Sequence, residues 1–65
     1  MKYIIDTHNG KKREWKSAAV LYYTDRHTAK FIESIIREKA QADTRLEELT
    51  DDENSICVET TRFSK

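Results

Sequence analysis

The strongest constraint on the fold is the dipeptide Asn9-Gly10, which holds the single glycine of a 65-residue chain without proline. Asn-Gly favours a type I′ turn, whose backbone twist matches that of two adjoining antiparallel strands. A two-residue turn at this point sets Ile4 opposite Trp15 across the strand pair. We therefore predict a hairpin built from strands over residues 2–8 and 11–17.

The six residues after the hairpin, 18–23, fit either a strand or a helix. Their β-branched and aromatic end is typical of a strand. Four apolar side chains of this region also recur at helical spacing: Trp15, Ala18, Ala19 and Tyr22. We favour a strand that continues the second hairpin strand across a bulge, and a mainly helical chain is the alternative fold.

A helix is predicted over residues 25–42. Thr24 or Asp25 can cap its first turn, because each side chain offers an oxygen to the unpaired backbone amides. The large apolar side chains of this segment recur at helical spacing: Phe31, Ile32, Ile35 and Ile36. A helix with one apolar stripe packs that stripe on a second element, most simply a sheet.

Two further strands are predicted over residues 45–50 and 55–62, joined by an acidic loop. The second alternates apolar and polar side chains, as a half-buried strand does. Leu46 and Leu49 are three residues apart, so the first strand requires a bulge or is instead the end of the helix. The whole pattern predicts one α+β domain over residues 1–65. In it, a small antiparallel sheet of about four strands, ordered β-β-α-β-β in the chain, packs against one amphipathic helix.

The charge of the chain is balanced in total and uneven along its length. Twelve Lys and Arg match twelve Asp and Glu, which gives a formal net charge of zero. Residues 1–40 nevertheless carry nine bases and five acids, whereas residues 41–65 carry three bases and seven acids. If the two parts interleave in the sheet, these charges neutralise one another, whereas separated parts form two electrostatic faces.

The strongest candidate binding site is a group of bases around the single tryptophan, extended by two bases on the helix. Its residues are Lys11, Lys12, Arg13, Trp15, Lys16, Arg26 and Lys30. Bases of this kind contact phosphates, and an aromatic ring stacks on a nucleic-acid base. Nucleic-acid domains usually have a clear basic excess, so we favour an edge hairpin whose lysines discourage aggregation and whose tryptophan belongs to the core.

The acidic loop, which can contact a basic partner, contains Asp51, Asp52 and Glu53. Its spacing lacks the alternating oxygen ligands and central glycine of an EF-hand, so a solvated turn is the simpler interpretation. Cys57 is the single cysteine, and its spacing from His8 and His27 matches no metal site or catalytic arrangement. We therefore expect no enzyme activity, no metal and no cofactor.

A sheet covered by one helix leaves its second face open, and a large apolar surface there usually marks a contact with a partner. Depending on the strand register, the side chains on that face are Tyr3, Ile5, Tyr22 or Tyr23, and Cys57. The alternative is that the aromatic side chains divide between the core and scattered surface positions. We predict a non-enzymatic binding or regulatory protein that acts by surface contacts on a larger protein or protein–nucleic-acid assembly. The alternative function is a nucleic-acid-binding module that uses the basic first hairpin.

These predictions imply a protein partner, with a nucleic acid or a second copy forming a homodimer as the other options. The longest apolar stretch, residues 18–23, is far shorter than the roughly 20 residues of a spanning helix, so no membrane partner is expected. A single cysteine and the lack of an apolar leader before Asp6 predict a cytoplasmic location. Small size alone points to a phage or mobile-element protein that inhibits a host system.

Overall fold

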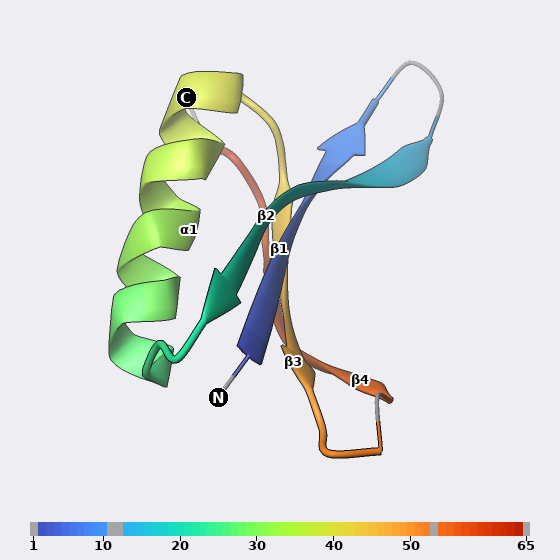
Figure 1. Ribbon diagram of the computed structural model, residues 1–65. Coiled ribbons are helices and arrows are strands. Elements are labelled where there is room, and N and C mark those ends of the chain that lie inside the picture. Colours follow the sequence, from blue (N-terminus) through green and yellow to red (C-terminus); the bar gives the residue numbers. More distant parts are fainter. Residues whose placement is uncertain (1, 11–12, 53, 65) are drawn as a thin grey trace.

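The computed structural model describes residues 2–10, 13–52 and 54–64, and Figure 1 shows its fold. The elements along the chain are β1 (Lys2–Asn9), β2 (Glu14–Tyr22), α1 (Arg26–Ala40), β3 (Thr44–Leu49) and β4 (Ser55–Thr61). The α+β class and the order β-β-α-β-β are therefore confirmed, and the mainly helical alternative is wrong. Within the described ranges, no helix has the length and apolar character that crossing a membrane requires.

The strands form one antiparallel sheet in the order β2-β1-β3-β4. β1 and β3 therefore occupy its centre, and β2 and β4 form its two edges. α1 lies along one face of the sheet, mainly over the central strands, and no described element covers the other face (Figure 1). We call this uncovered side the open face.

The first hairpin has a longer connection than the predicted two-residue turn. β2 begins at Glu14, so residues 10–13 connect the two strands. Ile4 pairs with Val20, and the predicted pairing of Ile4 with Trp15 is wrong. Near the turn, Trp15 pairs with His8 and not with Ile4, a shift of an even number of residues that keeps Trp15 on the same face as Ile4.

The segment after the hairpin continues β2 as a strand with a bulge, as predicted. The register shifts between Ile5 and Asp6 of β1, which leaves Ala18 as the extra residue of β2. An extra residue reverses the alternation of side chains along a strand. Trp15 and Val20 therefore share the open face, although an odd number of positions separates them.

The core lies between α1 and the sheet, and it is small. The fully buried apolar side chains of the described chain are Tyr3, Ile5, Ala29 and Leu46. Half-buried apolar side chains pack around them: Ala19, Leu21, Ile32, Ile36 and Val58. The expectation that Tyr3 and Ile5 lie on the open face is wrong, because the observed register points both toward α1.

α1 has the predicted cap at its start. The Asp25 carboxylate accepts a hydrogen bond of 2.7 Å from the Thr28 backbone amide. This bond satisfies one unpaired amide of the first turn, and it lowers the pKa of Asp25 below its ordinary value. At the other end, Gln41 adopts the left-handed conformation with φ of 51°, which ends the helix.

The helix is rotated relative to the predicted apolar stripe. Its inward side is made by Ala29, Ile32, Glu33 and Ile36. Phe31 is 63% exposed and Ile35 is 40% exposed, so only half of the predicted stripe faces the sheet. The small side chain of Ala29 lets the helix backbone come close to the strands, and this contact fixes the rotation.

The second hairpin has its bulge on β4 rather than on β3. The register shifts between Leu46 and Glu47 of β3, so Val58 is the extra residue of β4. β3 alternates regularly, and Leu46 faces the helix while Leu49 faces the open side. The predicted bulge in the first of these strands is therefore wrong, because the two leucines do not share a face.

Candidate functional site

The open face carries the candidate site, and strand alternation decides which side chains lie on it. Along β1 and β3, the residues directly before and after the buried Tyr3 and Leu46 point away from α1, and this alternation continues along each strand. The bulges in β2 and β4 each reverse the alternation in their own strand. The large side chains on this face are Lys2, Ile4, Asp6, His8, Trp15, Val20, Tyr22, Arg45, Glu47 and Leu49. The face therefore mixes aromatic, aliphatic and charged groups.

Arg45 forms the centre of this face. Its Nε lies 3.1 Å from Asp6 Oδ2, and a second guanidinium nitrogen lies 3.8 Å from Glu47 Oε2. The guanidinium carbon lies 4.5 Å from the centre of the Trp15 ring, which is a cation–π contact. The His8 ring packs on the same tryptophan, with 5.0 Å between the ring centres. We call these five residues the Arg45 cluster.

Strand pairing brings the Arg45 cluster together from three strands. Asp6 of β1 pairs with Arg45 of β3, and Glu47 follows two residues later on the same face. Trp15 of β2 pairs with His8 of β1. The cluster therefore forms only when β1 has paired with both of its neighbours.

The two acids of the cluster share a hydrogen bond. This bond to Asp6 raises the pKa of Glu47 above its ordinary value, and burial and the charge of Asp6 add to the rise. The Arg45 charge and a hydrogen bond from Ser55 oppose it. Ionising both carboxyl groups places like charges side by side, which favours a proton on Glu47. The charge of the open face therefore depends on pH.

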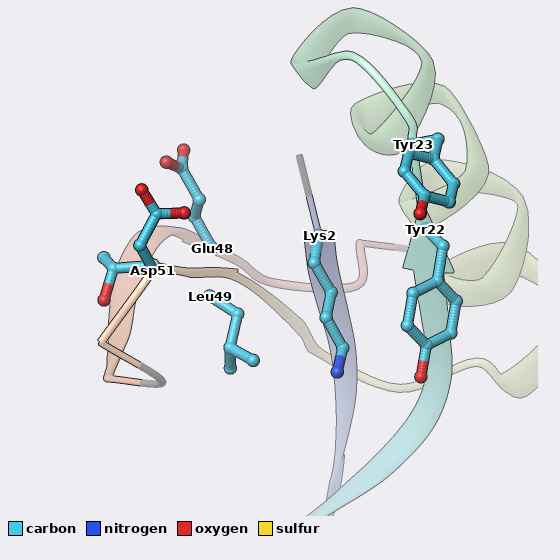
Figure 2. Close-up of a pocket in the computed structure, with 7 residues that line it drawn as sticks. Lys2, Tyr22, Tyr23, Glu48, Leu49 and Asp51 are labelled. Carbon is cyan, nitrogen blue, oxygen red and sulfur yellow. The ribbon is translucent and has the colours of Figure 1, made fainter.

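A groove of about 630 Å³ lies at the end of the sheet where β1 begins (Figure 2). It is lined by Lys2, Tyr22, Tyr23, Glu48, Leu49, Thr50 and Asp51. Figure 2 shows Lys2 between Tyr22 and Leu49, and the Lys2 ammonium lies 4.8 Å from the centre of the Tyr22 ring. The groove thus offers an aromatic wall, one cation and carboxylates within a short distance of the open face.

A second groove, of about 670 Å³, lies at the opposite end of the sheet. It is lined by Thr7, His8, Gly10, Lys16, Ala40, Gln41, Ala42 and Asp43. These residues come from the first hairpin and from the end of α1. Lys16 pairs with Thr7 and faces the helix side there, so it does not belong to the open face.

Part of the predicted basic site belongs to the first hairpin. Arg13 ends the connection between the strands, and Lys16 lies in β2. Trp15 is half-buried on the open face, so the expectation of a core tryptophan is wrong. Lys11 and Lys12 lie outside the described residues.

The other predicted bases, Arg26 and Lys30, lie on α1 and bind acids. Arg26 donates a hydrogen bond of 3.0 Å to Glu48, and the Lys30 ammonium lies 3.5 Å from Glu59. Each pair joins the base-rich first part of the chain to the acid-rich second part. The two parts therefore interleave, and these two bases do not join those of the hairpin in one basic surface.

The acidic loop forms a turn closed by Thr50 and Asn54. The Thr50 backbone amide donates a bond of 2.8 Å to the Asn54 carbonyl, and the Thr50 hydroxyl donates one of 3.0 Å. Asp51 lines the first groove, and Asp52 is exposed to solvent. Glu53 lies outside the described residues. The loop thus places one carboxylate at the rim of the groove.

Sequence reasoning missed Asp6, Arg45 and Glu47, which the structure places at the centre of the open face. A signal for Arg45 and Glu47 exists, because their spacing of two within a predicted strand puts both on one face. No sequence signal joins them to Asp6, since that contact depends on the pairing of β1 with β3.

The described residues hold no other arrangement typical of a chemical site. In the described ranges, no three His, Cys, Asp or Glu side chains gather as a group that could hold a metal ion. Cys57 is exposed, and its sulfur lies 3.7 Å from the Thr60 hydroxyl. Comparisons with known protein families, curated proteins and solved structures find no match for this chain. The open face is therefore the candidate functional site.

Proposed function

We propose that this chain is a non-enzymatic binding protein that regulates a larger protein by covering part of its surface. The observation that carries the proposal is that Trp15, Tyr22 and Arg45 lie on the same uncovered sheet face, with the Arg45 guanidinium packed against the Trp15 ring. Side chains of these three types dominate the binding energy of protein interfaces. Ile4 and Val20 lie beside them and supply the apolar surface that excludes water from such contacts.

The Arg45 cluster supports the proposal because its side chains are held in place before any partner arrives. Ion pairs with Asp6 and Glu47 orient the guanidinium, and the Trp15 ring packs against it. Side chains that are ordered in the free protein lose little conformational freedom on binding. A partner would therefore meet a preformed contact point with a groove beside it.

Charge makes a nucleic-acid partner the weaker candidate. Asp6 and Glu47 flank the guanidinium of Arg45, and their carboxylates repel phosphates. Arg26 and Lys30 are each occupied by an acid of the same chain. Binding to a phosphate backbone instead gains from bases that neutralise phosphates and release counterions. The bases of the first hairpin remain the site for this alternative.

The proposal also includes a cellular location and a biological setting. A cytoplasmic setting follows from the single cysteine, because extracellular domains of this size usually rely on disulfides. A role as a phage or mobile-element inhibitor of a host system rests on the small size alone. In both settings the chain acts by occupying a surface and not by catalysis.

A pull-down from cell lysate, with and without nuclease, tests the proposal. The tagged chain is compared with Trp15→Ala and Tyr22→Ala on the open face. Ile56→Ala is the control, since Ile56 is an exposed apolar residue of β4 on the helix side. We expect the tagged chain to capture a protein partner that remains bound after nuclease treatment. Trp15→Ala and Tyr22→Ala should no longer capture this partner, and Ile56→Ala should still capture it.

Two outcomes contradict the proposal. A bound factor that nuclease releases favours the nucleic-acid module, and a partner that every variant retains excludes the open face as the contact surface. Circular dichroism of each variant separates loss of binding from loss of fold.

A further inference from the structure

Two carboxyl groups on the open face share one cation. Asp6 Oδ2 lies 3.1 Å from Arg45 Nε, and Glu47 Oε2 lies 3.8 Å from a terminal nitrogen of the same guanidinium. The Asp6 and Glu47 side chains are 7% and 18% exposed, so water screens their charges weakly. With both acids ionised, these three side chains carry one positive and two negative charges. One negative charge is therefore left without a counter-charge inside the group.

Glu47 is the acid that holds the cation less tightly. Its contact with the guanidinium is the longer of the two and exceeds the usual length of a hydrogen bond. Its other oxygen, Oε1, accepts a hydrogen bond of 3.3 Å from the Ser55 hydroxyl, which a neutral carboxyl also accepts. A hydrogen bond to Asp6 is the main cause that raises the pKa of Glu47. A proton that enters the acid pair therefore resides on Glu47 and bonds it to Asp6.

The open face carries other ionisable groups, and they lie apart from this contact. Within the described residues they are Lys2, His8, Tyr22 and Cys57. The Lys2 ammonium lies over the Tyr22 ring at the start of β1, and the His8 ring packs on Trp15. Cys57 is exposed on β4, opposite the glutamate of the pair. α1 lies on the other face of the sheet, so its charges do not face the pair (Figure 1).

We propose that Asp6, Arg45 and Glu47 form a pH switch, in which a proton on Glu47 ends its contact with the guanidinium and frees one nitrogen of Arg45. A neutral Glu47 donates a hydrogen bond to Asp6 and no longer attracts the cation. Arg45 keeps its own bond to Asp6, because Nε makes that contact. The surplus negative charge of the group disappears, and the freed nitrogen can donate to an acidic group of a partner.

The consequence for binding rests on the proposed function, because it takes the open face as the contact surface. The guanidinium carbon of Arg45 lies 4.5 Å from the centre of the Trp15 ring. The freed nitrogen therefore lies beside an aromatic ring on a guanidinium that Asp6 still orients. A partner that presents an acidic group to this point is expected to bind more tightly at acidic pH than at neutral pH.

A titration of the purified chain, followed by nuclear magnetic resonance, tests the switch. The signals of the Glu47 carboxyl group, Arg45 Nε and the Trp15 indole are measured from about pH 3 to about pH 8. We expect the Glu47 midpoint to lie above the ordinary value of 4.5, and the Arg45 signal to change at the same midpoint. A Glu47 midpoint at or below 4.5 overturns the proposal, and so does an Arg45 signal that does not follow Glu47.

Three variants separate a switch from an ordinary surface acid. Asp6→Asn removes the neighbouring charge, so the Glu47 midpoint is expected to fall. Glu47→Gln imitates the neutral acid and should abolish the change that Arg45 shows at the Glu47 midpoint. Glu48→Gln is the matched control, since Glu48 follows in the same strand and binds Arg26 on the helix side. It should leave the Glu47 midpoint unchanged.

Two results with these variants contradict the switch. One is a Glu47 midpoint that Asp6→Asn leaves in place, and the other is an Arg45 signal that Glu47→Gln leaves unchanged. Circular dichroism confirms that each variant folds. The titration of the wild type and of Glu47→Gln decides the question without Asp6→Asn if that variant does not fold.

The pull-down at acidic and at neutral pH tests the effect on binding. The wild type should retain its partner more strongly at acidic pH, and Glu47→Gln should retain it equally at both. Equal retention by the wild type contradicts an acidic contact group on the partner. If no partner is captured, the proposed function fails, whereas the titration of the purified chain still decides the switch.

Discussion

The two faces of the sheet each hold a pair of carboxyl groups, and the two pairs are stabilised in different ways. On the open face, Arg45 contacts both Asp6, at 3.1 Å, and Glu47, at 3.8 Å. Under the helix, Glu33 forms a hydrogen bond with Glu59. Glu33 is 1% exposed, and one of its oxygens has no hydrogen-bond partner among the described atoms. The open pair contacts a cation directly, whereas one acid of the covered pair is buried with an oxygen that has no hydrogen-bond partner in the described part of the chain.

Burial explains this difference. Loss of water is the main cause that raises the pKa of Glu33, and the hydrogen bond and charge of Glu59 add to the rise. A hydrogen bond from Thr44 and the charge of Arg37 oppose it. Arg37 also donates a bond of 2.9 Å to the Thr44 hydroxyl, so its guanidinium is shared. A helix cover thus removes water without supplying a full counter-charge, and this raises the pKa of the buried acid.

Removing the cation of the open pair is expected to have the largest effect. Asp6 is 5% exposed, so Arg45→Ala leaves a buried carboxylate without its ion pair. We expect the free energy of unfolding at neutral pH to fall by about 2–4 kcal/mol, as measured by urea denaturation. Asp6→Asn in the same chain removes the stranded charge and should recover part of the loss. A loss below about 1 kcal/mol would show that this cation does not hold the open pair.

Removing the acid of the covered pair is expected to act in the opposite direction. The amide of Glu33→Gln keeps the shape of the side chain and donates to Glu59 without requiring a proton from solvent. We expect the free energy of unfolding at neutral pH to rise by about 1–2 kcal/mol. Glu38→Gln, at an exposed position of the same helix, is the matched control and should change little. Destabilisation by Glu33→Gln would mean that Glu33 is ionised in the fold.

The covered pair also gives stability a pH dependence. The folded pKa of Glu33 lies above its ordinary value of 4.5, so the folded chain binds this proton more tightly than the unfolded chain. The stabilisation is fully present below the unfolded pKa and is lost as the pH rises through the folded pKa. Urea denaturation between about pH 4 and 8 should therefore show that the advantage of Glu33→Gln over the wild type grows with pH. An advantage that is constant across this range would exclude titration of Glu33 as its cause.

A smaller loss of stability is expected when the tryptophan ring of the Arg45 cluster is removed. Trp15→Leu keeps an apolar side chain and deletes the ring that packs against Arg45 at 4.5 Å. We expect a loss of about 1 kcal/mol in the free energy of unfolding, typical of a partly exposed cation–π contact with its packing. Thermal unfolding of Trp15→Leu beside Arg45→Ala and the double variant measures the coupling. Additive losses would show that the ring and the guanidinium do not cooperate.

The smallest effect is expected at the rim of the covered pair. Lys30 lies 3.5 Å from Glu59, and the two side chains are 47% and 34% exposed. Exposed ion pairs contribute little, so Lys30→Ala should change the free energy of unfolding by no more than about 0.5 kcal/mol. If urea denaturation gives a loss above about 1 kcal/mol, the covered pair also relies on a cation and the contrast between the two faces disappears.

Local signals in the sequence predict the elements of this fold well. The turn preference of Asn9-Gly10 places a hairpin, and Asp25 marks the start of the helix. The register of the strands and the rotation of the helix about its axis were predicted less well, because both depend on which side chains are buried together. The two bulges shift the strand pairing, and close packing of Ala29 turns the charged Glu33 inward and the apolar Phe31 outward.

The candidate site could be predicted only in part, because its centre is a long-range contact. Trp15 is singled out by the sequence as an aromatic residue among bases. The ion pair between Asp6 and Arg45 joins residues 39 positions apart, and no local pattern connects them. Nothing in the sequence fixes which strand pairs with β1 on the side opposite β2, so the interleaving of bases and acids emerges only from the sheet order.

The central position of β1 has a consequence for synthesis on the ribosome. β1 ends at Asn9, and its inner neighbour β3 begins only at Thr44. At about 5–20 residues per second, the ribosome needs about 2–7 s to make the intervening chain. During that interval the nascent hairpin has unpaired backbone on both of its sides. The inner edge of β1 therefore gains its partner strand only after residues 10–43 have been made.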